Sequence, residues 1–176
     1  MTIPLLLMAK RVKTEIGDIF SVTLDNGNKK YFQYVANDLN QLNSDVIRSF
    51  KREYPADEIP VFSELLAGDI DFHAHTMINI GVKQDLFKQG GKSIVYPALN
   101  DVLFRDTNDY GKKVGEEPIK VSVNWFVWKI NDESFTKVGK LEGENRNAEI
   151  GVVIPPFAIV DRIKTGHYNF IYPGFE

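Results

Sequence analysis

Apolar and polar residues alternate along several short stretches of this chain, which is typical of half-buried β-strands. Residues 16–24 carry branched apolar side chains, residues 30–35 are rich in aromatic ones, and the sequence Asp25-Asn26-Gly27-Asn28 separates them. Asn-Gly is the strongest short hairpin signal, because both central residues of a type I′ turn need a positive φ. The pattern therefore predicts a β-hairpin over residues 16–36.

Further strand-like segments follow, and one of them is ambiguous. Residues 46–54 fit either a strand or a helix, for which Ser44-Asp45 could supply the N-terminal cap. The clearest strand is residues 119–130, where apolar and polar residues alternate before both faces become apolar. The other segments predicted as strands are residues 69–80, 135–141, 150–154 and 168–173.

Two short helices are predicted from apolar residues at helical spacing. The first covers residues 60–68 and ends in a glycine, where a C-terminal cap belongs. The second opens at Pro156, since proline is well tolerated at the first helical position, and ends at Gly166. Gly90-Gly91 marks a loop, and residues 94–118 have so little regularity that we expect a long surface excursion there.

Length and composition favour one domain of mainly β structure. The chain has 176 residues, of which 43% are hydrophobic and 12% aromatic. A chain of this size can bury a sufficient core without disulfides or metals, and aromatic enrichment favours pleated surfaces. The predicted class is α+β, mainly β, in one domain over residues 1–176. We expect a strongly bent antiparallel sheet or partly open barrel with about two short helices packed on it.

Charge and cysteine content limit the possible functions. The net charge is −3 and the basic residues are dispersed, so the chain lacks the electrostatic signature of nucleic-acid binding. The absence of cysteine excludes disulfides, thiolate metal sites and a cysteine nucleophile. The apolar run over residues 3–8 is too short for a signal peptide or a membrane span, so a first strand or packed arm is expected there. We therefore predict a cytoplasmic protein without nucleic-acid or membrane partners, in an oligomeric state that the sequence leaves open.

The pattern most suggestive of chemistry is His73-Ala74-His75. Residues two apart on a strand point to the same face, and Asp71 shares that face. Three such ligands could hold a metal ion, so the alternative function is a metal-dependent hydrolase that uses Asp71, His73 and His75. The other interpretation is a set of half-buried polar residues. No nucleophile elbow or complete phosphate-binding loop is present, and we predict no catalytic residues and no cofactor.

The aromatic residues Trp125, Phe126 and Trp128 allow two interpretations. They could form a stacking platform for a ligand, or they could fill the core, since such rings bury large areas. Trp125 and Trp128 have opposite parity, so one is expected to face the core and the other a helix or the surface. An exposed Trp128 would also suit an oligomerisation module.

A family resemblance is carried by the predicted hairpin. The segments Ile16-Gly17-Asp18-Ile19-Phe20, Leu24-Asp25-Asn26-Gly27 and Tyr31-Phe32-Gln33-Tyr34-Val35 resemble the start of the bacterial immunity protein 26 family. The resemblance implies a β-rich cytoplasmic protein that neutralises a bacterial toxin by binding it, and it implies no catalytic residues. We therefore expect a non-catalytic binding protein with a toxin as partner. The residues predicted to contact the partner are Asp18, Tyr34, Phe126 and Trp128.

Overall fold

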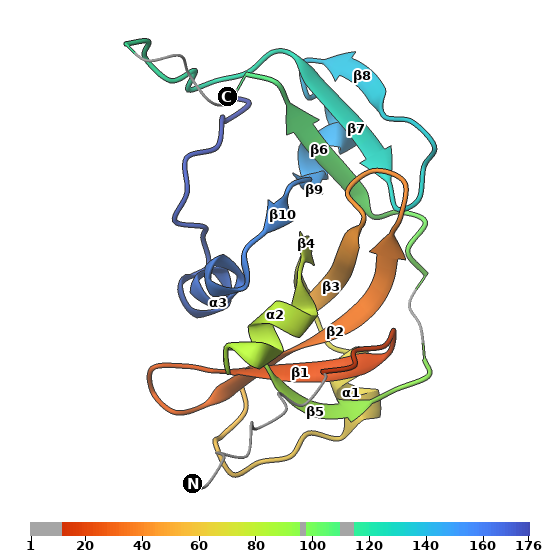
Figure 1. Cartoon of the computed structure of the whole chain (residues 1–176), viewed down its shortest axis with the longest axis vertical. Helices are drawn as coiled ribbons and strands as arrows, with labels where there is room; N and C mark the ends of the chain where they lie inside the picture. Colours follow the sequence, from red (N-terminus) through yellow and green to blue (C-terminus); the bar gives the residue numbers. More distant parts are fainter. Residues whose placement is uncertain (1–11, 96–97, 110–114) are drawn as a thin grey trace, which may run out of the picture.

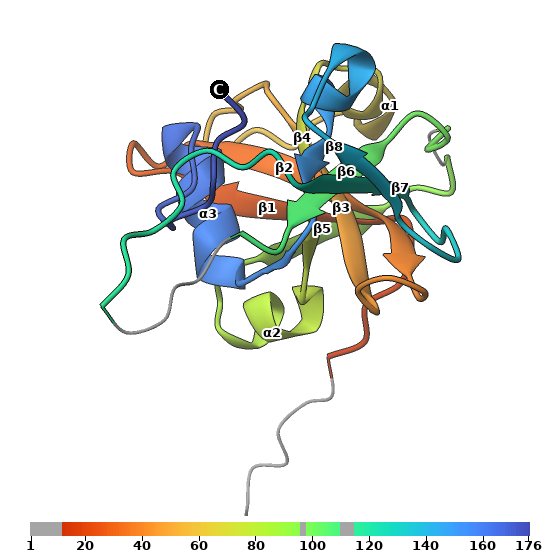
Figure 2. The same cartoon turned by 90° about the horizontal axis from the view of Figure 1, so that it is seen from above.

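Two β-sheets stacked along the long axis of the molecule make up the fold (Figure 1). The structure is a computed structural model that describes residues 12–95, 98–109 and 115–176. The view from above shows the smaller sheet crossing over the larger one (Figure 2). The fold is mainly β, as predicted, and its sheets do not close into a barrel. The apolar run at residues 3–8 lies outside the described residues.

The larger sheet runs, in spatial order, through β10 (Val153–Ile154), β4 (Ile70–Thr76), β3 (Ser44–Phe50), β2 (Lys29–Asp38), β1 (Asp18–Thr23) and β5 (Lys88–Lys92). The smaller sheet runs through β8 (Thr136–Gly139), β7 (Trp125–Lys129), β6 (Leu103–Thr107) and β9 (Glu149–Ile150). The helices are α1 (Phe62–Leu66), α2 (Ile78–Lys83), α3 (Pro156–Thr165) and the 3-10 helix η1 (Gly143–Asn147). Neighbouring strands are antiparallel, except for the parallel pairs β10–β4 and β6–β9.

The predicted hairpin is confirmed by β1 and β2, but its turn is not of the predicted type. Only Gly27 of the turn residues has a positive φ, at 87°. The Gly27 N–H donates to the Leu24 carbonyl, and the Leu24 N–H donates to Asn28. The connection is therefore a three-residue loop, a type I turn followed by a left-handed glycine, so Asn26 does not need a positive φ.

The larger sheet is strongly bent, and a β-bulge contributes to the bend. Tyr34 pairs with Ile47 while Ala36 pairs with Val46, so Val35 is the extra residue in β2. A bulge of this kind bends its strand and increases the local twist. The end of β2 and the start of β3, which the hairpin loop joins, curve towards the smaller sheet in Figure 1.

Several predicted strands have different bounds in the structure. The ambiguous segment over residues 46–54 is a strand only as far as Phe50, and the strand predicted over residues 69–80 stops at Thr76, just before α2. The strand predicted over residues 119–130 starts only at Trp125, and the residues before it form a single bridge between Val121 and Gly174. The other differences are that residues 149–154 cross between the two sheets as β9 and β10, and that residues 168–173 form no strand.

The prediction of a loop at Gly90-Gly91 and of an irregular region over residues 94–118 was wrong in part. Both glycines lie in β5, where a Cβ on Gly91 would stand 2.1 Å from the Phe62 ring. The irregular region contains β6, whose Phe104 is fully buried. Both predicted helices are present, and α3 ends at Gly166 in the left-handed conformation. No helix within the described ranges is long and apolar enough to cross a bilayer.

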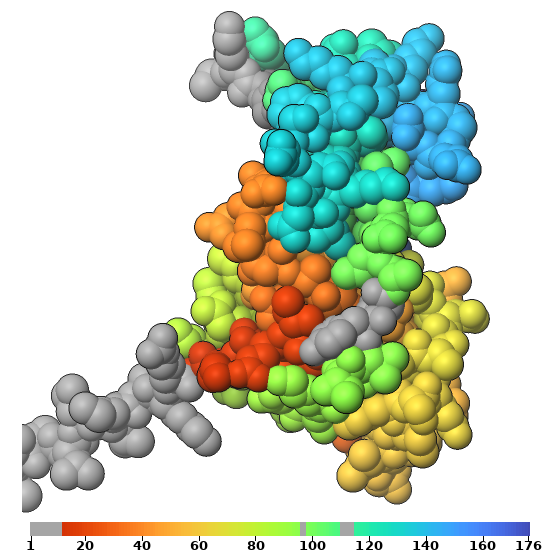
Figure 3. Space-filling view, turned by 90° about the vertical axis from the view of Figure 1, so that its right-hand side faces the viewer, coloured from red at the N-terminus to blue at the C-terminus, as the bar shows by residue number. Residues whose placement is uncertain are grey.

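The larger sheet is covered on both faces. One face packs against α2 and α3, while the other face carries α1 at one end and the smaller sheet at the other. In the space-filling view the cyan residues of the smaller sheet rest directly on the orange end of the β2–β3 hairpin (Figure 3). The buried residues between the two sheets are Val35, Ala36, Val46, Phe104 and Trp128.

The chain passes from the smaller sheet to the larger one at Gly151, which lies between β9 and β10. Its N–H donates to the Arg105 carbonyl at 2.8 Å. A Cβ at this position would stand 2.2 Å from the Trp128 ring and 2.9 Å from the Arg105 carbonyl oxygen. Only glycine therefore lets this crossing pass so close to the indole.

We predict that Gly151→Ala lowers the free energy of unfolding by roughly 2 kcal/mol, because the added methyl group overpacks the contact with Trp128. Urea denaturation followed by circular dichroism measures the change. Gly90→Ala is the matched control, since its Cβ would meet only ordinary contacts, the nearest at 3.6 Å from Tyr31. Equal effects of the two substitutions would contradict the prediction.

Candidate functional site

A row of polar side chains crosses the larger sheet on the face that looks towards the smaller one. Strand pairing places Gln33 of β2 beside Arg48 of β3, and Arg48 beside His73 of β4. Glu149 of β9 continues the row, because its Oε1 accepts the His73 backbone N–H at 2.9 Å. Apolar clusters lie on the same face, one beneath α1 and one between the sheets. The row therefore lies between two apolar clusters of this face.

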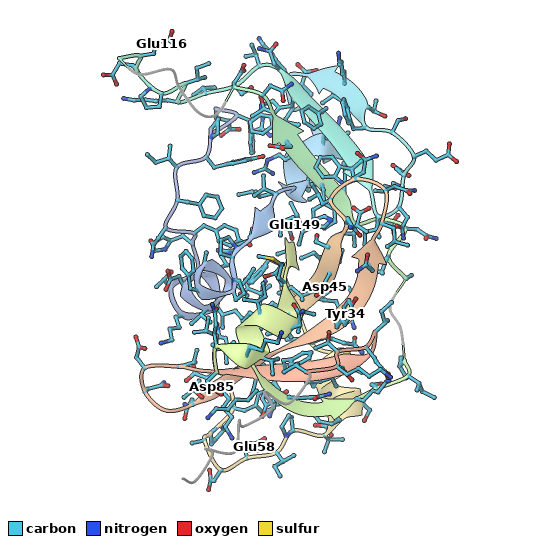
Figure 4. All side chains as sticks on the ribbon, in the orientation of Figure 1. Tyr34, Asp45, Glu58, Asp85, Glu116 and Glu149 are labelled. Carbon is cyan, nitrogen blue, oxygen red and sulfur yellow. The ribbon has the colours of Figure 1, made fainter. Side chains whose placement is uncertain are left out.

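The row borders an open cleft of about 290 Å³, which we call the inter-sheet cleft. In Figure 4, Glu149 lies between the two sheets, next to the end of β4. The polar residues that line the cleft are Arg48, His73, Asp101, Asn147 and Glu149. The apolar lining residues are Ile70, Ala98, Val102 and Leu103.

Arg48 is the most deeply buried charged group of the cleft, at 7% exposure. Its Nη2 donates to the Gln33 Oε1 over a long 3.4 Å, and its Nε has no hydrogen-bond partner. The guanidinium carbon lies 5.2 Å from the centre of the Phe50 ring, which positions it by packing. Burial lowers the pKa of Arg48. Arg48 is thus a buried cation whose Nε–H donor is unused.

His73 and Glu149 are adjacent but do not form an ion pair at neutral pH. Burial, helped by the nearby Arg48 charge, lowers the pKa of His73 to about 4, so the imidazole is neutral. Its Nδ1 lies 3.9 Å from the Glu149 Oε1, which is too far for a hydrogen bond. Burial also raises the pKa of Glu149, although the His73 backbone N–H opposes this.

A second polar group joins the two sheets and is closed to solvent. The Asp38 carboxylate, at the end of β2, accepts His75 Nε2 at 2.9 Å and Trp128 Nε1 at 3.2 Å through the same oxygen. Its other oxygen accepts the backbone N–H groups of Asn131 at 3.1 Å and Gln41 at 3.4 Å. Asp38 and His75 are both fully buried. We call this group the Asp38 joint.

The structure gives Asp71, His73 and His75 three different partners, so their predicted convergence on one metal ion was wrong. Asp71 faces Arg162 of α3 at 3.9 Å, His73 lies beside Glu149, and His75 bonds to Asp38. Within the described ranges no three His, Asp or Glu side chains gather closely enough to hold a metal. The three partners come from three different elements, α3, β9 and β2, so the three side chains are held apart.

Three of the four residues predicted to contact a partner are buried. Asp18 accepts the Glu15 backbone N–H at 2.8 Å, and burial raises the pKa of Tyr34 to about 12. Trp128 is buried and belongs to the Asp38 joint. The oligomerisation hypothesis required an exposed Trp128, so the structure removes its basis. Only Phe126 is partly accessible, and its ring packs 4.4 Å from that of Phe135.

An apolar groove of about 230 Å³ lies beside the start of α3, and we call it the α3 groove. Phe157 lines it and is 61% exposed, although most large aromatic side chains of this fold are buried. Ile171 follows the lining residue Phe170 and is 83% exposed. The remaining lining residues are Val152, Ile154, Pro155, Ala158, Asp161 and Asn169.

Sequence reasoning missed Arg48, Asp38, Glu149 and Phe157. A signal for Arg48 was present, because it shares strand parity with the apolar Val46 and therefore stands as a charge on a core-facing side. Asp38 and Glu149 could not be found this way, since their partners are distant in sequence.

No protein-family model, curated protein or solved structure matches this chain. The resemblance of its N-terminal hairpin to immunity protein 26 therefore stays a prediction.

We predict that stability falls by about 2 kcal/mol between about pH 7 and about pH 5, in part because of His73. A histidine whose pKa is lower in the folded state than in the unfolded state binds a proton more readily when the chain is unfolded. Lowering the pH from the unfolded-state pKa towards the folded-state pKa therefore favours unfolding. Burial lowers the pKa of His75 as well, which adds to the same trend. NMR titration of the ring resonances measures the pKa of His73, and a value at or above the ordinary 6.5 would contradict the prediction.

We predict that Asp38→Asn costs roughly 3 kcal/mol of stability, because an amide nitrogen replaces one of the two oxygens that accept these hydrogen bonds and cannot accept them itself. Chemical denaturation at neutral pH gives the difference. Asp25→Asn is the control, since this carboxylate is exposed and makes one surface ion pair, with Lys164. If the two variants were equally stable, the Asp38 joint would not hold the sheets together.

Proposed function

We propose that this chain is a non-catalytic binding protein of the immunity type, which neutralises a bacterial toxin in the cytoplasm by direct binding. The resemblance of the hairpin over residues 16–36 supports the class of partner. The α3 groove, with the exposed Phe157 on its wall, is the observation that supports binding to a protein.

The α3 groove has the features of a protein-docking site. An exposed aromatic side chain next to an apolar depression offers both a projection and a pocket to a partner, and such anchors dominate binding energy. Asp161 and Asn169 lie on its rim and bond to each other at 3.5 Å, so polar groups border an apolar centre. The occupant that fits is an apolar side chain of the toxin, placed beside Phe157.

The base of the groove is well supported. Ala158 and Ile159 of α3 pack into the main core, and Pro156 and Ile154 are also buried. A rigid support lowers the entropy lost on binding. The net charge of −3 would add a modest attraction to a basic toxin such as a nuclease.

We predict that co-expression of this protein with the toxin encoded beside its gene protects cells, and that Phe157→Asp abolishes protection. A charge at this position would place an unpaired carboxylate in an apolar interface. Survival counts and size-exclusion chromatography of the purified pair measure protection and complex formation.

Ile59→Asp is the matched control, since Ile59 is equally apolar, 82% exposed and far from α3 in sequence. It should protect as well as the wild type. Unchanged killing together with no complex on the column would reject the immunity function. Full protection by Phe157→Asp would reject the α3 groove as the binding surface.

A further inference from the structure

Arg48 is a buried cation without an ion-pair partner in the part of the chain that the structure describes. No acidic side chain there forms an ion pair with it. Among the residues that the structure describes, its side chain makes one hydrogen bond, the long contact with the neutral Gln33. A guanidinium removed from water in this way is unfavourable unless an anion pairs with it. The missing partner is therefore the feature of the inter-sheet cleft that needs an explanation.

We propose that the inter-sheet cleft is a binding site for a small organic carboxylate, held by the Arg48 guanidinium. Arginine binds carboxylates through the N–H donors of its planar guanidinium, and the Arg48 side chain lines the cleft. The neutral His73 ring adds an N–H donor, and its Nδ1 lies too far from the Glu149 Oε1, at 3.9 Å, to use that donor in a hydrogen bond. The Asn147 amide is a further donor on the opposite wall.

The shape and lining of the cleft favour an organic acid with an apolar body. A volume of about 290 Å³ suits a small molecule, and the walls beside Arg48 come from Ile70, Val102 and Leu103. Such a mixture of apolar walls with a few placed polar groups is typical of small-ligand sites. The ligand's carboxylate would meet Arg48 and its carbon skeleton would meet these walls.

The charges around the cleft favour a carboxylate over phosphate. Arg48 is the only cationic side chain that lines the cleft in the described residues, whereas Asp101 and Glu149 both border it. His73 adds no charge because its imidazole is neutral. A ligand with one negative charge is attracted by Arg48 and meets less repulsion from the two carboxylates than a dianion does. This site does not depend on the toxin-binding function, which rests on the α3 groove.

The test is isothermal titration calorimetry of the purified protein with butyrate, benzoate, benzamide and inorganic phosphate. We expect saturable binding of a carboxylate and none of benzamide, the neutral analogue of benzoate. Arg48→Met should weaken carboxylate binding by about tenfold or more, because it removes a charged hydrogen-bond donor. Arg52→Met is the matched control, since Arg52 also lies over an aromatic ring, that of Tyr54, but its side chain is exposed.

The proposal is overturned if neither carboxylate binds saturably, if phosphate binds more tightly, or if Arg48→Met binds as the wild type does. Circular dichroism verifies that Arg48→Met is folded. Should it not fold, amide NMR shifts of the wild-type protein on benzoate addition decide the matter. Shifts centred on Arg48, His73 and Glu149 would support the site, and shifts confined to other regions would overturn it.

Discussion

The buried Asp38 carboxylate is the interaction on which the arrangement of the two sheets depends. It lies at the end of β2 and accepts donors from β4 and β7, so one side chain bonds both sheets. A buried carboxylate is costly unless several donors satisfy it, and here side-chain and backbone N–H groups do so. Removing any one of these N–H donors would leave part of the Asp38 charge without a hydrogen bond. Because all of the donors are needed, the two sheets meet in one well-defined geometry.

The inter-sheet cleft is a consequence of this geometry. The Asp38 joint and the apolar cluster around Phe104 hold the sheets together at one end of their interface. The short crossing through Gly151 keeps β9 and β10 close to both sheets at another point. Between these two constraints the polar row lies next to open space instead of a packed apolar layer. The cleft is therefore built into the way the sheets meet.

Local patterns predicted the class of fold and much of the larger sheet. The hairpin and α3 were predictable because their signals lie in adjacent residues, such as the turn glycine and the proline that opens the helix. The strand β6 was not predictable from alternation, since polar residues follow Phe104 and its burial comes from Trp128 and His75. Likewise Gly91 resembles a loop residue, but a ring from α1 packs against it.

The candidate site was less predictable than the fold because its residues meet only through tertiary packing. The His73-Ala74-His75 pattern predicted a shared set of metal ligands as the alternative, whereas in the structure each histidine has a different carboxylate neighbour. The sequence does contain one exception to the expected pattern, because the charged residue Arg48 occupies a core-facing position in a strand. Sequences that fold well keep such conflicts where they serve a function. Within the described residues Arg48 forms no ion pair and its Nε has no hydrogen-bond partner, and these two observations are the basis of the proposed anion site.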